Sequence, residues 1–122
     1  MINLPSGIKV NDLIDDFKVI SWEASETLLY YAQMLQNSND DIKILKNDNI
    51  DDPVTLADLK VNEIVIKRIN EKYSDIPWQI LSEENVKISS ENSDIKSDWV
   101  WILDPLDGTK DFIQGTGNYA MH

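Results

Sequence analysis

The chain has 122 residues, of which 42% are hydrophobic and 27% charged, the size and composition of one compact folded domain. Its formal net charge of −11 disfavours binding to nucleic-acid polymers and anionic membranes, and no apolar run is long enough to span a bilayer. Cysteine is absent, which excludes disulfides and thiolate metal sites, so we expect the protein to work in the reducing cytoplasm.

Two long helices are expected in the first half of the chain. Apolar residues recur at three- and four-residue steps over 10–36 and again over 55–73. Thr55 suits the N-cap of the second helix, and Asp58 at the third helical position completes a capping box. The segment 42–50 between the helices is expected to be extended or a loop.

Two short strands are expected next, and each leads into acidic residues. Residues 78–82 read WQILS and are followed by Glu83 and Glu84. Residues 99–103 read WVWIL, a continuous apolar run that suits a strand buried on both faces. The polar stretch 85–98 between the strands is expected to be a loop.

The chain is expected to turn sharply after the second strand. Pro105 cannot donate to a sheet, so the strand should end at Asp104, and Gly108 permits a turn with positive φ. Thr109 is expected to cap a short helix over 110–114, and 118–122 begins a further strand. The order of elements predicts an α+β fold, with two long helices packed on an incomplete sheet.

Three separate segments place carboxylates at the ends of these elements. They are Asp58, Glu83 with Glu84, and Asp104 with Asp107. Oxygen ligands without histidine or cysteine favour Mg²⁺ or Mn²⁺ over zinc. Beside the start of a helix, which favours anions, such ligands suit a metal-assisted reaction of a phosphate.

Each of these features also has an ordinary structural explanation. The sequence DPLDG is a common turn composition, and Asp58 alone is explained by helix capping. Glu83 and Glu84 alone suit a solvated loop. The interpretation as a functional site depends on their combination.

Three motifs resemble those of the inositol monophosphatase superfamily of Mg²⁺-dependent phosphatases, in their order and spacing. They are DPVTLAD at 52–58, LSEEN at 81–85 and WILDPLDGTKDF at 101–112. The chain is most similar to the 3'(2'),5'-bisphosphate nucleotidase (CysQ-type) branch. The resemblance covers the N-terminal half of the family. It implies that 1–122 is an N-terminal metal-binding α+β domain of the layered α/β sugar-phosphatase fold, with the C-terminal half absent.

The resemblance also implies roles for individual residues. Metal ligands would be Glu83, Asp104, the Leu106 carbonyl and Asp107. Catalytic residues would be Asp58, Glu83 and Thr109, with Asp58 acting through Thr109 on the attacking water and Glu84 in support. Phosphate would be bound by Gly108, Thr109 and Lys110. Lys46 is a weak match to the lysine of the family's mobile loop.

The activity implied is hydrolysis of 3'-phosphoadenosine 5'-phosphate to AMP and phosphate, with Mg²⁺ as cofactor and Mn²⁺ as an alternative. The partner expected is a small phosphorylated substrate, and an unfinished sheet predicts self-association into homo-oligomers. The chain by itself is expected to be a weak or inactive enzyme. Two alternatives stay open: an inositol-1-monophosphatase, and a non-catalytic metal- or partner-binding fragment.

Overall fold

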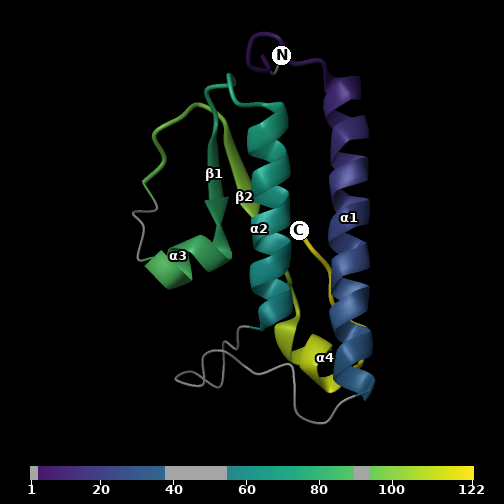
Figure 1. The fold of residues 1–122 in the computed structure, drawn as a ribbon. Coiled ribbons are helices and arrows are strands. Elements are labelled where there is room, and N and C mark those ends of the chain that lie inside the picture. The colour runs from purple at the N-terminus through teal and green to yellow at the C-terminus, as the bar shows by residue number, and fades with distance from the viewer. Residues whose placement is uncertain (1–2, 38–54, 90–93) are drawn as a thin grey trace.

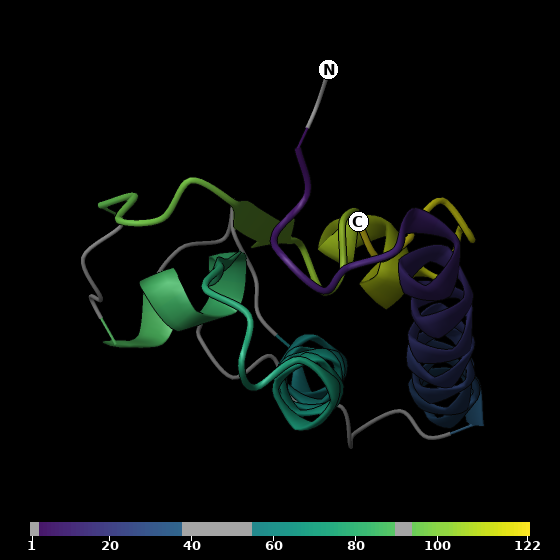
Figure 2. The same cartoon turned by 90° about the horizontal axis from the view of Figure 1, so that it is seen from above.

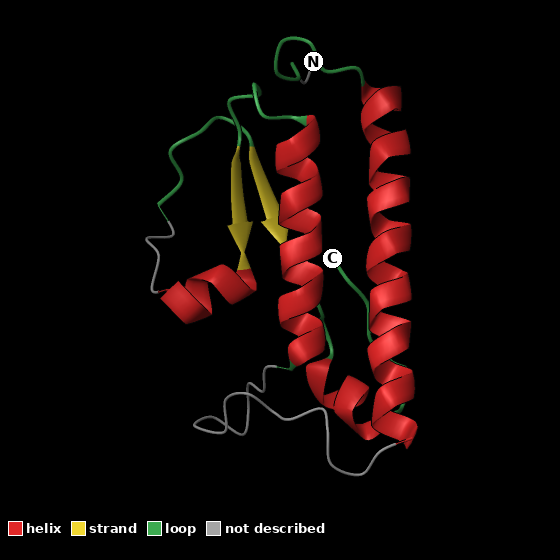
Figure 3. Ribbon diagram, in the orientation of Figure 1, coloured by secondary structure: helices red, strands yellow, loops and turns green. Residues whose placement is uncertain are grey.

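The computed structural model describes residues 3–37, 55–89 and 94–122. In chain order its elements are α1 (Val10–Asn37), α2 (Leu56–Lys72), β1 (Gln79–Ser82), α3 (Glu83–Ser89), β2 (Val100–Leu103) and α4 (Thr109–Gln114). The antiparallel helices α1 and α2 stand beside a small two-stranded sheet, which confirms the predicted α+β fold (Figures 1 and 3). The predicted segment 42–50, with Lys46, lies outside the described residues.

The core lies between the two long helices and the end of the sheet. Its buried members come from α1, α2 and the chain after β2: Ile20, Ala24, Leu28, Ala57, Val61, Val65, Ile69, Leu103, Leu106 and Phe112. Burying these apolar side chains stabilises the fold by about 25 cal/mol for each Å² removed from water. No helix in the described part of the chain is both long and apolar enough to cross a membrane.

The strands β1 and β2 are parallel, paired from Gln79 with Val100 to Ser82 with Leu103. Their C-terminal ends therefore lie at one end of the sheet, and both strands point toward the end of the molecule at which α2 begins (Figure 1). The predicted loop over 85–98 is wrong in its first part, because α3 follows β1 directly. Glu83 and Glu84 occupy the first turn of α3, where the helix dipole favours negative charge.

Seen from above, α3 and α1 lie on opposite sides of the molecule, with α2 and the strands between them (Figure 2). The prediction that 99–103 is buried on both faces is wrong for this chain, because Ile102 is 79% exposed. Within the described residues, the helices cover one face of the sheet, where Trp101 stacks on Phe17 with 4.4 Å between the ring centroids. Leu103, on the same face as Trp101, is buried.

The chain after β2 turns back and pairs with its own last residues. Asp104 and His122 exchange two backbone hydrogen bonds of 2.7 and 2.9 Å, and Asp107 and Ala120 exchange two of 2.8 and 3.1 Å. The strand expected over 118–122 is therefore a short antiparallel pairing. This pairing fixes the turn that carries both aspartates.

Gly108 is required by two features of this turn. Its φ is +84°, in the left-handed region, and a Cβ placed on it would lie 2.5 Å from the Asn118 carbonyl oxygen. Gly108 is also the N-cap of α4, and Thr109 is the first helical residue. The prediction that Thr109 caps this helix is therefore wrong, and its hydroxyl is used elsewhere.

Candidate active site

Asp58 is held at the start of α2 by the predicted capping box. Thr55 donates to Asp58 Oδ2 through its backbone N–H at 2.8 Å and through its hydroxyl at 2.6 Å. The Thr55 hydroxyl in turn accepts from the backbone N–H groups of Ala57 and Asp58. Thr55 and Asp58 are both buried, so the capping interpretation of Asp58 is confirmed.

The other oxygen of Asp58 joins α2 to α4. Asp58 Oδ1 lies 3.1 Å from the Thr109 hydroxyl, which also lies 3.0 Å from the Leu106 carbonyl oxygen. The hydroxyl carries one proton, so it donates to one of these two acceptors at a time. Burial raises the pKa of Asp58, and the hydrogen bonds from Thr55 and Thr109 oppose that rise. Asp58 therefore both caps a helix and orients Thr109.

Glu83 and Asp104 meet at the carboxyl ends of the two parallel strands. Burial, followed by a hydrogen-bonded contact with the Glu83 carboxyl, raises the pKa of Asp104 to about 6. The charge of Glu83 and that of Asp107 add to this rise, whereas a hydrogen bond from the Leu106 backbone opposes it. Two carboxyls in contact repel when both are ionised, so the pair favours a shared proton or a cation.

Leu106 links this acidic pair to Thr109. Its N–H donates to Asp104 Oδ1 at 3.2 Å, a local turn in which an aspartate accepts from the residue two positions on. Its carbonyl faces the Thr109 hydroxyl. One short turn therefore connects the acidic pair with the Asp58–Thr109 pair.

Asp107 and Lys110 lie further out on the same turn. Asp107 has a side chain 59% exposed and lies 3.7 Å from His122 Nδ1, measured from its Oδ2. Lys110 is exposed on the first turn of α4. Among residues 3–37, 55–89 and 94–122, no three Asp, Glu or His side chains are close enough to enclose a metal as they stand.

The donor set nevertheless suits a hard divalent cation. Three carboxylates and one backbone carbonyl provide oxygen only, which is the ligand type of Mg²⁺ and Mn²⁺. The Glu83 and Asp104 carboxyls are in contact, and the Asp107 side chain is exposed on the same turn. The residues present therefore fit the cation that the sequence predicted.

A buried polar cluster that sequence analysis did not single out lies behind Glu83. It joins Asn62 of α2 to Ser82 and Asn85, the residues on either side of the two glutamates. Glu84, also buried, lies within the same turn. The only sequence signal was a polar residue at position 62, on the apolar face of a helix, four residues after Asp58.

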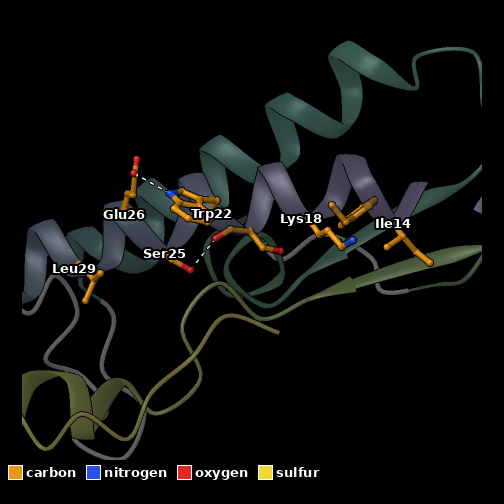
Figure 4. A pocket seen from close by; sticks show the side chains of 8 residues that line it. Ile14, Lys18, Trp22, Ser25, Glu26 and Leu29 are labelled. Atoms are coloured by element: carbon orange, nitrogen blue, oxygen red, sulfur yellow. Dashed lines mark hydrogen bonds between the residues drawn. The ribbon is translucent and has the colours of Figure 1, made fainter. Parts of the chain in front are cut away.

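A separate groove runs along the outer face of α1. It is lined by Ile14, Phe17, Lys18, Trp22, Glu26 and Leu29, and the Trp22 ring nitrogen donates to Glu26 Oε1 at 3.0 Å (Figure 4). Every lining residue belongs to α1, and none belongs to the acidic turn. The groove is therefore a different feature from the candidate active site.

The sequence matches a known protein family, and the fold matches solved structures. The sequence model of the inositol monophosphatase family matches residues 12–122. A 3'(2'),5'-bisphosphate nucleotidase CysQ from Aggregatibacter actinomycetemcomitans is 35% identical over 115 residues, which cover 93% of this chain and 39% of that protein. The corresponding CysQ of Haemophilus influenzae is 39% identical over 79 residues, 63% of this chain and 27% of that protein.

Among solved structures, the extragenic suppressor protein suhB of Bartonella henselae superposes with a TM-score of 0.68 at 21% identity. The alignment covers 90% of this chain and 38% of that one, and it shows a shared fold. The match of the family model to residues 12–122 establishes that the chain belongs to the inositol monophosphatase family. The chain spans 39% and 27% of the lengths of the two CysQ relatives.

Proposed function

We propose that Asp58, Glu83, Asp104 and Thr109 belong to the active site of a Mg²⁺-dependent phosphomonoesterase. The observation that carries this proposal is the hydrogen-bond network of one turn: the Leu106 N–H donates to Asp104 Oδ1, and the Thr109 hydroxyl lies between the Leu106 carbonyl and Asp58 Oδ1. The Glu83 carboxyl lies against Asp104 and raises its pKa. Acidic ligands and a polarised hydroxyl on one turn are what a metal-assisted displacement at phosphorus requires.

The proposed metal ligands are Glu83, Asp104, Asp107 and the Leu106 carbonyl, with Mg²⁺ as the cofactor and Mn²⁺ as a substitute. A cation held by these residues would supply a lower pKa for the attacking water and compensation for the charge on the leaving oxygen. The protein contributes the geometry. The Asp104 backbone is fixed by His122 and its carboxylate by Leu106, so this ligand is oriented before a cation arrives.

The proposed role of Asp58 is to act through Thr109. Asp58 is 1% exposed, and each of its carboxylate oxygens lies within hydrogen-bond distance of a threonine hydroxyl, so direct contact with substrate is blocked. It can instead act as the final base: the Thr109 hydroxyl would pass its proton to Asp58 Oδ1 while its oxygen takes a proton from the attacking water. The proposed phosphate contacts are the backbone N–H groups of Gly108 and Thr109 and the ammonium group of Lys110.

The proposed substrate is 3'-phosphoadenosine 5'-phosphate, which would be hydrolysed to AMP and phosphate. The printed names of the two CysQ relatives support this choice, as do the LSEE sequence at 81–84 and Lys110. The net charge of −11 argues against a nucleic-acid polymer as the substrate, because the acidic surface repels a long phosphate backbone. A small nucleotide needs only a local binding site, so the net charge does not argue against it. A cytoplasmic location belongs to the same proposal.

Self-association is the remaining part of the proposal. Ile102 is 79% exposed on β2, on the sheet face that the long helices leave uncovered. Copies of the chain would cover this apolar surface by associating. Light scattering should therefore report particles larger than one chain, and Ile102→Lys should shift them toward the monomer. A monodisperse monomer of the unchanged chain would contradict this part.

The activity is tested by phosphate release in the presence of Mg²⁺. The substrates are 3'-phosphoadenosine 5'-phosphate, inositol 1-phosphate and fructose 1,6-bisphosphate. Two proteins are compared: the chain itself, and a chimera in which it replaces the matching segment of the Aggregatibacter CysQ. We expect the nucleotide to be preferred by the chimera and activity near background for the chain alone.

Asp104→Asn and Asp98→Asn form a matched pair for this assay, since Asp98 is exposed before the same strand. Asp104→Asn should lower turnover of the chimera by about a hundredfold or more, and Asp98→Asn should leave it unchanged. A preference for inositol 1-phosphate would move the assignment to that substrate. A folded chimera that binds Mn²⁺ and releases phosphate from none of the three would contradict the enzyme proposal.

A further inference from the structure

Ser82, Glu83, Glu84 and Asn85 form one continuous turn between β1 and α3. Ser82 is the last residue of the strand, and Glu83 begins the helix. Glu83 lies against Asp104, a second carboxylate, and repulsion between the two negative charges disfavours this position of the turn. Other interactions of the turn must therefore oppose the repulsion.

Asn62 contacts the residues on both sides of the two glutamates. The Ser82 hydroxyl donates to Asn62 Oδ1, and Asn62 Nδ2 donates to Asn85 Oδ1 at 2.8 Å. Asn62 is 8% exposed and Ser82 1% exposed, so these hydrogen bonds have little competition from water. One amide side chain thus fixes the turn before and after Glu83 and Glu84.

The position of Asn62 connects this turn to the rest of the site. It lies on α2 four residues after Asp58, so the two side chains lie on the same face of one helix. Asp58 reaches Thr109 at the start of α4, whereas Asn62 reaches the turn that carries Glu83. The first two turns of α2 therefore hold both halves of the candidate site.

We propose that Asn62 is a positioning residue, which orients Glu83 as a metal ligand by hydrogen bonding to Ser82 and Asn85. This inference rests on the proposed function, because it needs Glu83 and Asp104 to bind a cation. Hydrogen bonds behind a metal ligand orient it, and their loss typically costs about 10–100-fold in metal affinity. A purely structural role for Asn62 predicts a different result: lower stability, with unchanged affinity in the folded protein.

The test measures Mn²⁺ affinity in the full chain through the loss of the free-ion EPR signal. Circular dichroism first identifies a temperature at which every variant is folded. The variants are Asn62→Leu, which keeps the shape and removes both hydrogen bonds, and Ser82→Ala, which removes one. Asn70→Leu is the matched control, because Asn70 is exposed two turns further along α2.

We expect Asn62→Leu to weaken Mn²⁺ binding by about tenfold and Asn70→Leu to leave it unchanged. Ser82→Ala should weaken binding by a smaller factor, and should add nothing in the Asn62→Leu background. If Asn62→Leu does not fold, the effect of Ser82→Ala against Asn70→Leu decides the question.

Asp104→Asn separates a failure of the proposed metal site from a failure of the proposed role of Asn62. If it weakens binding while the folded Asn62 and Ser82 variants bind as tightly as the unchanged chain, the inference about Asn62 is wrong and the metal site stands. If Asp104→Asn binds as tightly as the unchanged chain, the proposed metal site fails, and the inference about Asn62 fails with it.

Discussion

The candidate active site around Asp58, Glu83, Asp104 and Thr109, called the acidic corner below, differs from the outer face of α1 in how its side chains are used. In the corner, Asp58, Asp104 and Thr109 each have specific hydrogen-bond partners. On the outer face of α1, Trp22 and Leu29 leave most of their apolar surface in water (Figure 4). Hydrogen bonds therefore fix the positions of the side chains in the acidic corner. The outer face of α1, in contrast, does not contribute to the core of the described residues.

The contrast is sharpest between Leu28 and Leu29, which are adjacent on α1. Leu28 is 4% exposed within the core, and Leu29 is 63% exposed. Leu28→Ala should lower the free energy of unfolding by about 2–5 kcal/mol, because it leaves a cavity. Leu29→Ala should change it by no more than about 0.5 kcal/mol. Urea unfolding of both variants measures the difference, and equal losses would show that the two faces of α1 are not distinct.

Within the corner, Asp58→Asn separates capping from catalysis. Asparagine still accepts from the Thr55 backbone at the N-cap, so the free energy of unfolding should fall by no more than about 1 kcal/mol. It would no longer present a carboxylate to Thr109, and turnover of the chimera should fall by about a hundredfold. Full turnover with unchanged stability would leave capping as the sole role of Asp58.

Gly108 tests how closely the corner is packed. Gly108→Ala would place a methyl group 2.5 Å from the Asn118 carbonyl oxygen. Gly115, at the other end of α4, has a similar φ of +75° and open space around it. Both alanine variants should lose about 1–2 kcal/mol from the left-handed backbone, and Gly108→Ala should lose about 1–3 kcal/mol more. Thermal unfolding that shifts equally in both would contradict the close approach.

The smallest expected effect is that of the Arg68–Glu23 pair, one of the ion pairs that join α1 to α2. Arg68 donates to both carboxylate oxygens of Glu23 at 2.9 Å, and this lowers the pKa of Glu23 below its ordinary value of 4.5. Its contribution is therefore present above that pH and lost as the pH falls through the lowered pKa. Because both side chains are more than a third exposed, the contribution should not exceed about 1 kcal/mol.

Glu23→Gln tests this pair by urea unfolding at neutral and at acidic pH. The variant should be less stable than the unchanged chain at neutral pH, and the difference should vanish once Glu23 is protonated. Glu63→Gln is the control, because Glu63 pairs with Lys60 within α2 alone. A difference that persists in acid would show that the loss at Glu23 is not electrostatic.

Local patterns in the sequence predicted most of the secondary structure. The apolar periodicity gave both long helices, and the capping box at Thr55 is present in full. The two strands begin one residue later than predicted, at Gln79 and Val100, and end where predicted. These features depend on residues close in sequence, which is why periodicity and capping rules identify them.

The predictions that were wrong or missing depend on contacts between segments that are far apart in the sequence. Polar composition did not distinguish the helix α3 from a loop. The apolar run of β2 did not reveal that Ile102 faces away from the helices. The hydroxyl of Thr109 could have capped α4 or contacted Asp58, and the structure places it against Asp58. The partners of Asn62 lie on β1 and α3, so no short-range pattern could have named them.

The most direct test of the account is the Mn²⁺ affinity of the unchanged chain, Asp104→Asn and Asp98→Asn, measured by EPR. If Glu83 and Asp104 share a cation, Asp104→Asn should weaken binding by about tenfold or more, because it removes a charged ligand. Asp98→Asn removes the same charge from an exposed position and should bind as the unchanged chain does. Equal affinity in all three proteins would contradict the assignment of this corner as the metal site.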